Sequence, residues 1–396
     1  MKWGLVVLFA ATCAAGDFSE RGFLEFMGDF YPREAPNDSG HAVGEASFRY
    51  EMFYKPAPWL QFSVGADAHS DSHLQVERRL HLSLWDREVQ RPAFALREAS
   101  VTVSVKKLTL QLGKQFIRWG KADLLNPTDR FAPRDYINVV ENDFLPVGAA
   151  RLTYGGASDT LDLVWEPRFT PSRVPLLNQR WTVVPGGITL HELGPDYPGG
   201  SQFGARWNHV GRLAEFSFSA FDGYNHLPLI RGTAAGFQLF YPRIRTYGAD
   251  TAVPLKFLTF RGEVAYFTSH NPQADQYCLY VVQLERQAGE WFFTAGYAGQ
   301  AVTEHRSVAD FNPERGLARS ILTHAGYTID TNRSVNFEAA VRQNGRGAWI
   351  KAEYSQAFGQ HWRATLILGL IRGEPDDFLG QYWRNSYGML RFRYSF

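Results

Sequence analysis

Cysteine is almost absent from this chain. Its 396 residues include only two, Cys13 and Cys278. Because Cys13 falls in an N-terminal segment that we expect to be removed, the remaining chain can form no internal disulfide bond. The fold therefore does not depend on disulfides. The sequence also has no Cys-x-x-Cys-His motif that would attach a haem group.

Long apolar runs, an excess of one charge and the common catalytic motifs are lacking too. Beyond residue 16, no uninterrupted apolar run reaches the ~18 residues of a membrane-spanning helix, which excludes a helical membrane protein. The 41 basic and 40 acidic residues give a net charge of +1, which argues against a nucleic-acid partner. Gly-x-Ser-x-Gly, His-Glu-x-x-His and phosphate-binding-loop motifs do not occur, so we expect neither an enzyme nor a bound cofactor.

Residues 1–16 have the pattern of a secretory signal peptide. Lys2 precedes an apolar stretch, and small residues follow it up to Asp17. We expect cleavage after Gly16, with cleavage after Ala15 as the second choice. The exported chain, residues 17–396, should then form a single domain.

From Asp17 onward, short runs of alternating character are separated by turn residues. In one such run, Ala46, Phe48, Tyr50, Met52 and Tyr54 fall on one parity, while Ser47, Arg49, Glu51 and Phe53 fall on the other. A period of two is typical of β-strands. We count about eighteen such runs, and roughly 14 to 18 strands fit the sequence, with residues 225–256 the hardest to assign.

The connections between these runs alternate in length. Short connections occur at residues 56–58, 106–107, 209–211, 287–290, 330–333 and 358–360; long ones occur near residues 31–44, 70–92, 119–147, 168–200, 305–319 and 373–385. Short turns at one rim and long loops at the other are typical of outer-membrane barrels. This pattern predicts that both termini lie on the short-turn, periplasmic side.

The final strand-like run carries a resemblance to a known class. In residues 388–396, Gly-Met-Leu-Arg-Phe-Arg-Tyr-Ser-Phe, apolar side chains occupy one parity and two arginines the other. The segment resembles the closing strand of bacterial outer-membrane β-barrels, which typically ends in Phe and is recognised by the barrel-assembly machinery. The resemblance implies an assembly signal at Tyr394 and Phe396, that machinery as a partner, and a location in the outer membrane of a Gram-negative cell.

We therefore expect an all-β protein, a transmembrane antiparallel up-and-down β-barrel. The alternative is a secreted soluble sandwich or propeller, but no fixed repeat period is present. Tyrosine and tryptophan also collect on the apolar parity, often near strand ends, as a membrane aromatic girdle requires: Tyr50, Tyr54, Tyr154, Trp165, Trp207, Tyr266, Tyr354 and Trp362.

If the apolar parity faces lipid, the polar parity lines the lumen. The expected lumenal charges include Arg49, Glu51, Arg261, Glu263, Lys351, Glu353, Arg391 and Arg393. Both signs occur, often two residues apart on one strand. They can pair across strands and hold the wall, or they can set a transverse field for polar solutes. Because the closing strand must pair with the first, Arg391 and Arg393 should lie near Glu25 and Asp29.

Residues 119–147 have no strand period and are interrupted by prolines, yet they retain aromatic and aliphatic side chains. Connections of this length are usually functional or disordered, and this composition argues against disorder. We expect the segment to fold into the barrel as a constriction with a mixed, slightly acidic field that favours cations weakly. Its candidate residues are Trp119, Asp123, Asp129, Arg130, Arg134, Asp135, Glu141 and Asp143.

The same region carries a second resemblance, through Gly113, Gln115, Trp119, Gly120, Asp123, Pro127, Asp129, Pro133 and Asp135. A strand with Gly-x-Gln, then Trp-Gly and an Asp- and Pro-rich loop, resembles a family of outer-membrane barrels related to alginate-export-type porins. This resemblance implies a channel or exporter and no particular substrate.

Asp67, His69, Asp71 and His73 form a weaker candidate site. They share one face if the strand continues, and they are competent ligands for zinc or another divalent metal. The alternative is a hydrated strand end that enters a loop.

The sequence thus predicts an outer-membrane channel for passive passage of small hydrophilic solutes. The alternatives are a polysaccharide-export conduit and a barrel sheath around an electron-transfer partner. The expected partners are outer-membrane lipids, the barrel-assembly machinery and small polar solutes, with a periplasmic partner left open.

Overall fold

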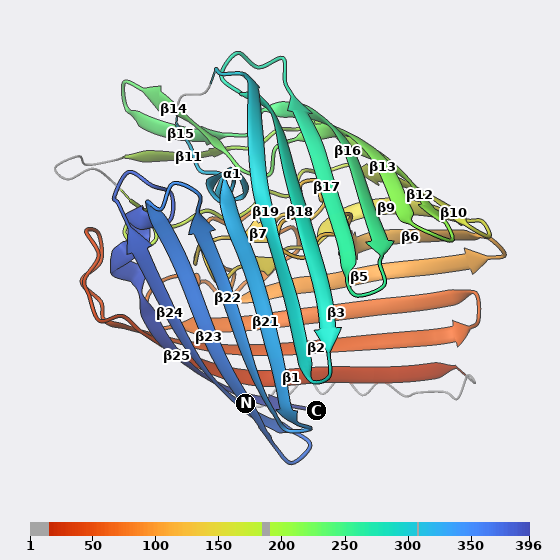
Figure 1. Ribbon diagram of the computed structural model, residues 1–396, viewed down its shortest axis with the longest axis horizontal. Helices are drawn as coiled ribbons and strands as arrows, with labels where there is room; N and C mark the ends of the chain where they lie inside the picture. Colours follow the sequence, from red (N-terminus) through yellow and green to blue (C-terminus); the bar gives the residue numbers. More distant parts are fainter. Residues whose placement is uncertain (1–15, 184–190, 307–308) are drawn as a thin grey trace, which may run out of the picture.

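The computed structural model describes residues 16–183, 191–306 and 309–396. The expected signal peptide, except for Gly16, lies outside these residues. The chain forms a closed barrel with 18 antiparallel strands, as predicted (Figure 1). The strands of the wall are β1 (Asp17–Phe30), β2 (Ala42–Ala57), β3 (Leu60–Asp71), β5 (Phe94–Val105), β6 (Leu108–Gln115), β9 (Val147–Gly155), β10 (Asp159–Glu166), β12 (Gln202–Val210), β13 (Glu215–Tyr224), β16 (Arg243–Pro254), β17 (Thr259–Thr268), β18 (Gln276–Ala288), β19 (Trp291–Glu304), β21 (Ser320–Asp330), β22 (Arg333–Arg342), β23 (Gly347–Phe358), β24 (Trp362–Gly373) and β25 (Tyr387–Ser395).

Each strand of the wall pairs with its neighbours along the chain, and β25 closes the barrel against β1. In this pairing Glu25 is opposite Arg393 and Met27 is opposite Arg391. Arg393 Nε lies 2.6 Å from Glu25 Oε2, and Arg391 Nε lies 3.8 Å from the same oxygen. The prediction that both arginines lie near Glu25 is confirmed. Asp29 is opposite Met389 instead.

Short turns join the strands at one end of the barrel, and the longer connections lie at the other. The short turns include residues 106–107, 289–290 and 331–332. Strand β1 begins and β25 ends at the short-turn end (Figure 1), where the backbones of Gly22 and Phe396 exchange two hydrogen bonds of 3.0 Å. This arrangement agrees with the predicted topology.

The remaining elements belong to the long connections. They are β4 (Leu82–Ser83), which pairs in parallel with β5, β7 (Arg134–Asp135), β8 (Asp143–Phe144), β11 (Glu192–Asp196), β14 (Leu229–Thr233), β15 (Gly236–Phe240), β20 (Ala309–Asp310), the one-turn helix α1 (Pro313–Gly316) and the 3₁₀ helix η1 (Gly380–Asn385). Strands β11, β15, β14 and β20 form a second, small sheet beyond the wall (Figure 1). None of the described helices is long and apolar enough to span a membrane.

The two faces of the wall differ as the period of two predicts. Large apolar side chains on one parity are exposed, for example Phe48 at 40%, Tyr154 at 46% and Trp165 at 46%. Such a continuous apolar exterior is what lipid requires and what a soluble sandwich avoids. On the other parity, apolar residues such as Leu279 and Val281 are fully buried, because a chain segment fills part of the lumen.

Candidate functional site

The segment between β6 and β9, residues 116–146, is called here the lumenal loop. It crosses the barrel interior and contacts inward-facing side chains of strands that follow it by more than a hundred residues. Its returning part forms a short hairpin, in which Arg134 is opposite Phe144 and Asp135 is opposite Asp143. The position of this loop divides the lumen.

Glu263 of β17 is the main anchor of the lumenal loop. Its Oε2 accepts hydrogen bonds from the backbone N–H groups of Lys121 and Ala122, at 3.1 and 3.2 Å. Its Oε1 accepts two more from Thr128, through the backbone N–H and the hydroxyl, each at 2.8 Å. Gly120 makes this approach possible: its φ is +95°, and a Cβ there would lie 2.6 Å from the carboxylate. One buried carboxylate thus satisfies four donors of the loop.

Gln283 and Arg261 extend this anchor along the loop. The side-chain oxygen of Gln283 accepts from the backbone N–H groups of Asp123 and Leu124, at 3.0 and 3.3 Å. Arg261 donates to the carbonyl of Lys121 at 2.7 Å and lies 3.4 Å from the Asp123 carboxylate. Asp123, a predicted constriction residue, therefore belongs to the attachment to the wall.

Lys121 is an attachment residue of the loop that the sequence interpretation did not identify. Its Nζ lies 2.9 Å from Asp250 of β16 and donates to Asn208 and Ser217, at 2.6 and 2.8 Å. The residues around Lys121 in the sequence give no signal that distinguishes it from a solvent-exposed lysine. Gln283 could have been found, because it lies on the polar parity of its strand.

Three predicted constriction residues are buried: Trp119 and Asp129 contact other parts of the loop, and Arg130 contacts Glu314 and the ring of Phe267. Trp119 is 2% exposed and makes an edge contact with Phe131, their ring centroids 5.3 Å apart. Asp129 accepts from the Trp119 backbone at 3.0 Å, and burial raises the pKa of its carboxyl. Arg130 pairs with Glu314 at 2.9 Å. These three side chains do not line the two cavities described below.

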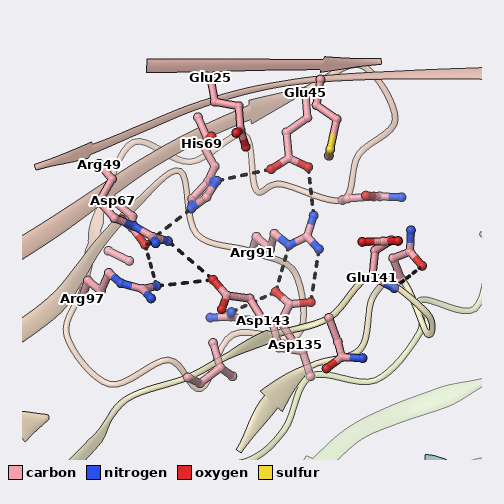
Figure 2. Close-up of a pocket in the computed structure, with 18 of the residues that line it drawn as sticks. Glu25, Glu45, Arg49, Asp67, His69, Arg91, Arg97, Asp135, Glu141 and Asp143 are labelled. Carbon is pink, nitrogen blue, oxygen red and sulfur yellow. Dashed lines mark hydrogen bonds and ion pairs between the residues drawn. The ribbon is translucent and has the colours of Figure 1, made fainter. Parts of the chain in front are cut away.

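A polar cavity of about 450 Å³ lies between the lumenal loop and the inner faces of β1, β2, β3, β5 and β25 (Figure 2). Six arginines and eight carboxylates line it: Arg49, Arg91, Arg97, Arg173, Arg391 and Arg393, with Glu25, Asp29, Glu45, Asp67, Asp86, Asp135, Glu141 and Asp143. Three of the carboxylates, Asp135, Glu141 and Asp143, come from the loop and were predicted to line the constriction. His69 also lines the cavity, 3.4 Å from Glu45 and 3.9 Å from Asp67, and side chains of both charge signs face this space.

Most charges in the polar cavity are paired. Asp67 lies 2.8 Å from Arg49 and 3.3 Å from Arg97 (Figure 2). The carboxylate of Asp143 lies 3.6 Å from each of these arginines and is 61% exposed on its side chain. The loop therefore presents one exposed carboxylate opposite two arginines of the wall. Asp143 is a more distant partner of Arg49 and Arg97 than Asp67 is.

Arg91 ties the loop to the wall at the deeper side of the cavity. It lies 3.1 Å from Glu45 and 2.9 Å from Asp135 (Figure 2). Arg173 approaches Asp135 at 3.2 Å. Burial opposes ionisation of Asp135, but the two arginines outweigh it and lower the pKa of this carboxyl to about 2. Arg91 and Arg173 were not predicted from the sequence.

The remaining predicted lumenal charges all lie on the inward parity. Lys351 is 3.2 Å from Glu141 of the loop, so it links β23 to the hairpin. Glu51 pairs with Arg21 at 2.6 Å. Glu353 has a weaker contact, a 3.5 Å hydrogen bond from Asn336 of the neighbouring strand. These pairs hold the wall or the loop, as the structural alternative for these residues predicted.

A second cavity, of about 350 Å³, lies on the opposite side of the lumenal loop, against β21, β22 and β23. Its apolar lining is Leu124, Leu125, Tyr136, Val139 and Val140 of the loop, Leu322, Ala339, Ala340 and Trp349 of the wall, and Leu317, Phe378 and Leu379 of the long connections. Its charged or titratable residues are Asp123, Arg134, Glu314, His324 and Glu338. We call it the apolar cavity.

The four residues of the weak metal candidate do not converge. Asp67 faces arginines, and His69 lies 3.9 Å from Asp67. Asp71 accepts backbone N–H groups of the loop that follows it. His73 bonds Asp38 at 2.7 Å. Among residues 16–183, 191–306 and 309–396, no group of three or more His, Cys, Asp or Glu side chains is arranged to hold a metal ion.

The candidate assembly residues lie on the lipid-facing side of the barrel closure. The ring of Phe396 stacks on two aromatic rings of β2, with centroids 6.3 Å away in each case. It covers Gly22, where a Cβ would lie 2.6 Å from the ring. Tyr394 packs against Trp362, at 5.0 Å between centroids. Phe396 thus contacts the first two strands of the wall.

A closed wall with an apolar exterior, a charged lumen and an inserted loop defines a transmembrane β-barrel. Comparison with solved structures agrees with this class. Acinetobacter baumannii OccAB3 shares 9% identity over 97% of this chain and 100% of its own, with a TM-score of 0.56. A BenF-like porin from Pseudomonas fluorescens Pf-5 shares 8% identity over 96% and 98%, with a TM-score of 0.55.

Pseudomonas aeruginosa OpdQ has 10% identity over 96% of this chain and 98% of its own, with a TM-score of 0.53. At these identities the likeness shows the fold alone. The chain belongs to the family described as "Protein of unknown function (DUF1302)", whose model matches residues 45–284. No curated protein matches the sequence.

Proposed function

We propose that this protein is an outer-membrane channel for passive passage of small hydrophilic solutes, with the lumenal loop as its constriction. The main supporting observation is the polar cavity between the loop and the wall, in which side chains of both charge signs face a space of about 450 Å³. An 18-stranded wall encloses an aqueous lumen wide enough to leak unless something narrows it, and the loop is held across that lumen by wall side chains.

The charges of the cavity support weak cation selectivity. Eight carboxylates face six arginines and His69, and Asp143, with 61% of its side chain exposed, is the carboxylate most open to solutes. Rings of acidic side chains favour cations in channels. Because nearly every charge has a partner of opposite sign, the net field is small and neutral polar solutes should pass as well.

The two alternatives need a wider passage. A polysaccharide-export conduit, of the kind that alginate-export-type porins imply, must pass a hydrated polymer, and a sheath must enclose a folded partner. The lumenal loop leaves cavities of about 450 and 350 Å³, which suit small molecules. The solved structures with this fold carry the names of channels and porins, which also favours the channel over an enzyme.

Planar-bilayer recordings test the proposal. We compare the intact protein with a variant in which residues 122–143 are replaced by a short Gly/Ser link. The variant should conduct more and lose the weak cation preference measured from the reversal potential in a salt gradient. Absence of channels from both well-folded proteins would refute the channel. Unchanged conductance would refute the constriction and place the loop's role elsewhere.

A further inference from the structure

The lumenal loop presents different chemistry to its two sides. Asp135, Asn138, Glu141 and Asp143 line the polar cavity, whereas Tyr136, Val139 and Val140 line the apolar one. Nearby residues of this segment thus line different cavities, although Arg134 also lines the apolar one and Asn142 lines both. The spacing is irregular, because residues 136–142 lie outside the two short strands of the hairpin. The loop is therefore amphipathic. Its apolar side chains face apolar residues of the wall, such as Leu322, Ala340 and Trp349, across the apolar cavity.

The apolar cavity has the size and lining of a small-molecule site. Cavities that bind organic ligands are lined mostly by apolar side chains and start at about 300 Å³. An apolar cavity of about 150 Å³ accommodates benzene, so the 350 Å³ here leaves room for a body of two fused rings. Ala340 of β22 is 2% exposed, and its small side chain contributes to the available space.

The charges around the apolar cavity are already occupied. Glu314 pairs with Arg130 at 2.9 Å, and Glu338 pairs with Lys351 at 3.3 Å. Asp123 lies 3.4 Å from Arg261 and accepts a hydrogen bond from Gln283 at 3.2 Å. The ring of His324 packs against Phe292, with centroids 5.7 Å apart. The guanidinium of Arg134 is held over the ring of Phe144, 4.0 Å from its centroid, and Phe144 lines the polar cavity. An ion that entered the apolar cavity would lose hydration without gaining a free partner. The chemistry therefore selects an uncharged ligand.

We propose that the apolar cavity is a binding site for an uncharged molecule with an apolar body of about two fused rings. This inference rests on the proposed function only in that a channel brings such molecules into the lumen. The loop then separates two classes of solute: small hydrophilic molecules contact its acidic side, and apolar molecules contact its aliphatic side.

The probe for this site is 6-bromo-2-naphthol. Crystals of the intact barrel soaked with it should show the anomalous signal of bromine between the lumenal loop and β21 to β23. Titration of the barrel in lipid nanodiscs gives the affinity. Ala340→Phe fills the cavity and should raise the dissociation constant about tenfold or more, because the ring occupies the space of the ligand.

Ala95→Phe is the matched control, since Ala95 is an inward alanine of β5 that lines the polar cavity. It should leave naphthol binding within about twofold of the intact protein. The inference would be overturned by equal naphthol binding to the intact protein, Ala340→Phe and Ala95→Phe, or by bromine found only on the lipid-facing surface. If Ala340→Phe fails to fold, the position of bromine in crystals of the intact barrel still tests the site. Conductance with no bromine in the cavity refutes this site and leaves the channel. Bromine in the cavity with no conductance refutes the channel and supports the site.

Discussion

Replacing Glu263 by alanine should release the lumenal loop from the wall. The carboxylate accepts four hydrogen bonds from the loop: from the backbone of Lys121 and Ala122, and from the backbone and hydroxyl of Thr128. All four lie between 2.8 and 3.2 Å. The substitution removes every acceptor at once and leaves the rest of the barrel wall unchanged.

The size of the effect follows from these contacts. A hydrogen bond to a charged group contributes ~1.5–3 kcal/mol, so four give an upper bound of about 6–12 kcal/mol. Water in the lumen can hydrate the freed N–H groups, so we expect a loss of about 3 kcal/mol, which is a change of roughly two powers of ten in the docking equilibrium. Glu263→Gln should be intermediate, because an amide oxygen can keep the two Thr128 bonds while its NH₂ faces two donors.

Single-channel recording measures this equilibrium directly. Glu263→Ala should show a high-conductance state far more often than the intact protein, and Glu263→Gln should fall between the two. Glu353→Ala is the control, since Glu353 is also a lumenal carboxylate but contacts only Asn336 of the wall among the described residues. If Glu263→Ala and Glu353→Ala give the same conductance distribution, the carboxylate does not hold the loop and the reasoning fails.

Three further predictions concern assembly, pH and topology. Phe396→Asp and Gly22→Val should lower the amount of assembled barrel, seen as heat-modifiable migration, without blocking export, because both disturb the contact of Phe396 with the first strands; normal abundance would contradict this. The folded-state pKa of Asp135, about 2, lies below the unfolded value of ~3.9. Its stabilisation is therefore complete above about pH 4 and lost as the pH falls towards 2. Hydrogen exchange of the loop should show this change, and Asp135→Asn should abolish it at a cost of about 3 kcal/mol at neutral pH; identical profiles would argue against it. An epitope tag after Ala235 should be detected on intact cells and one after Asn332 only after permeabilisation; the reverse result would invert the topology.

The sequence was most informative where the environment alternates from residue to residue. Lipid on one side and water on the other impose the period of two, so the strands, their number and the inward side of Arg49 or Lys351 could be predicted. The region around 225–242 was harder, because β14 and β15 are five residues each and belong to the small outer sheet. Their short pattern carries no signal of which sheet they join.

Within the lumenal loop, composition indicated an inserted, ordered segment but not which of its residues face a cavity. Trp119 and Asp129 looked like constriction residues because aromatic and acidic side chains are common there, yet both are buried in the packing of the loop. Lys121 and its partner Asp250 could not be paired in advance. Their contact depends on the stagger of the strands around the barrel, which is a property of the closed wall.

The attachment points of the lumenal loop lie far along the chain from the loop. Glu263 is 142 positions from Lys121, Gln283 is 160 from Asp123, and Tyr387, which donates to Glu141, is 246 positions from it. A growing wall that lacks its later strands offers the loop only the contacts that precede it in the chain, such as Arg91 with Asp135 and Arg49 with Asp143. The narrow passage is therefore complete only after the later strands have taken their places, so we expect the loop to dock late in barrel assembly.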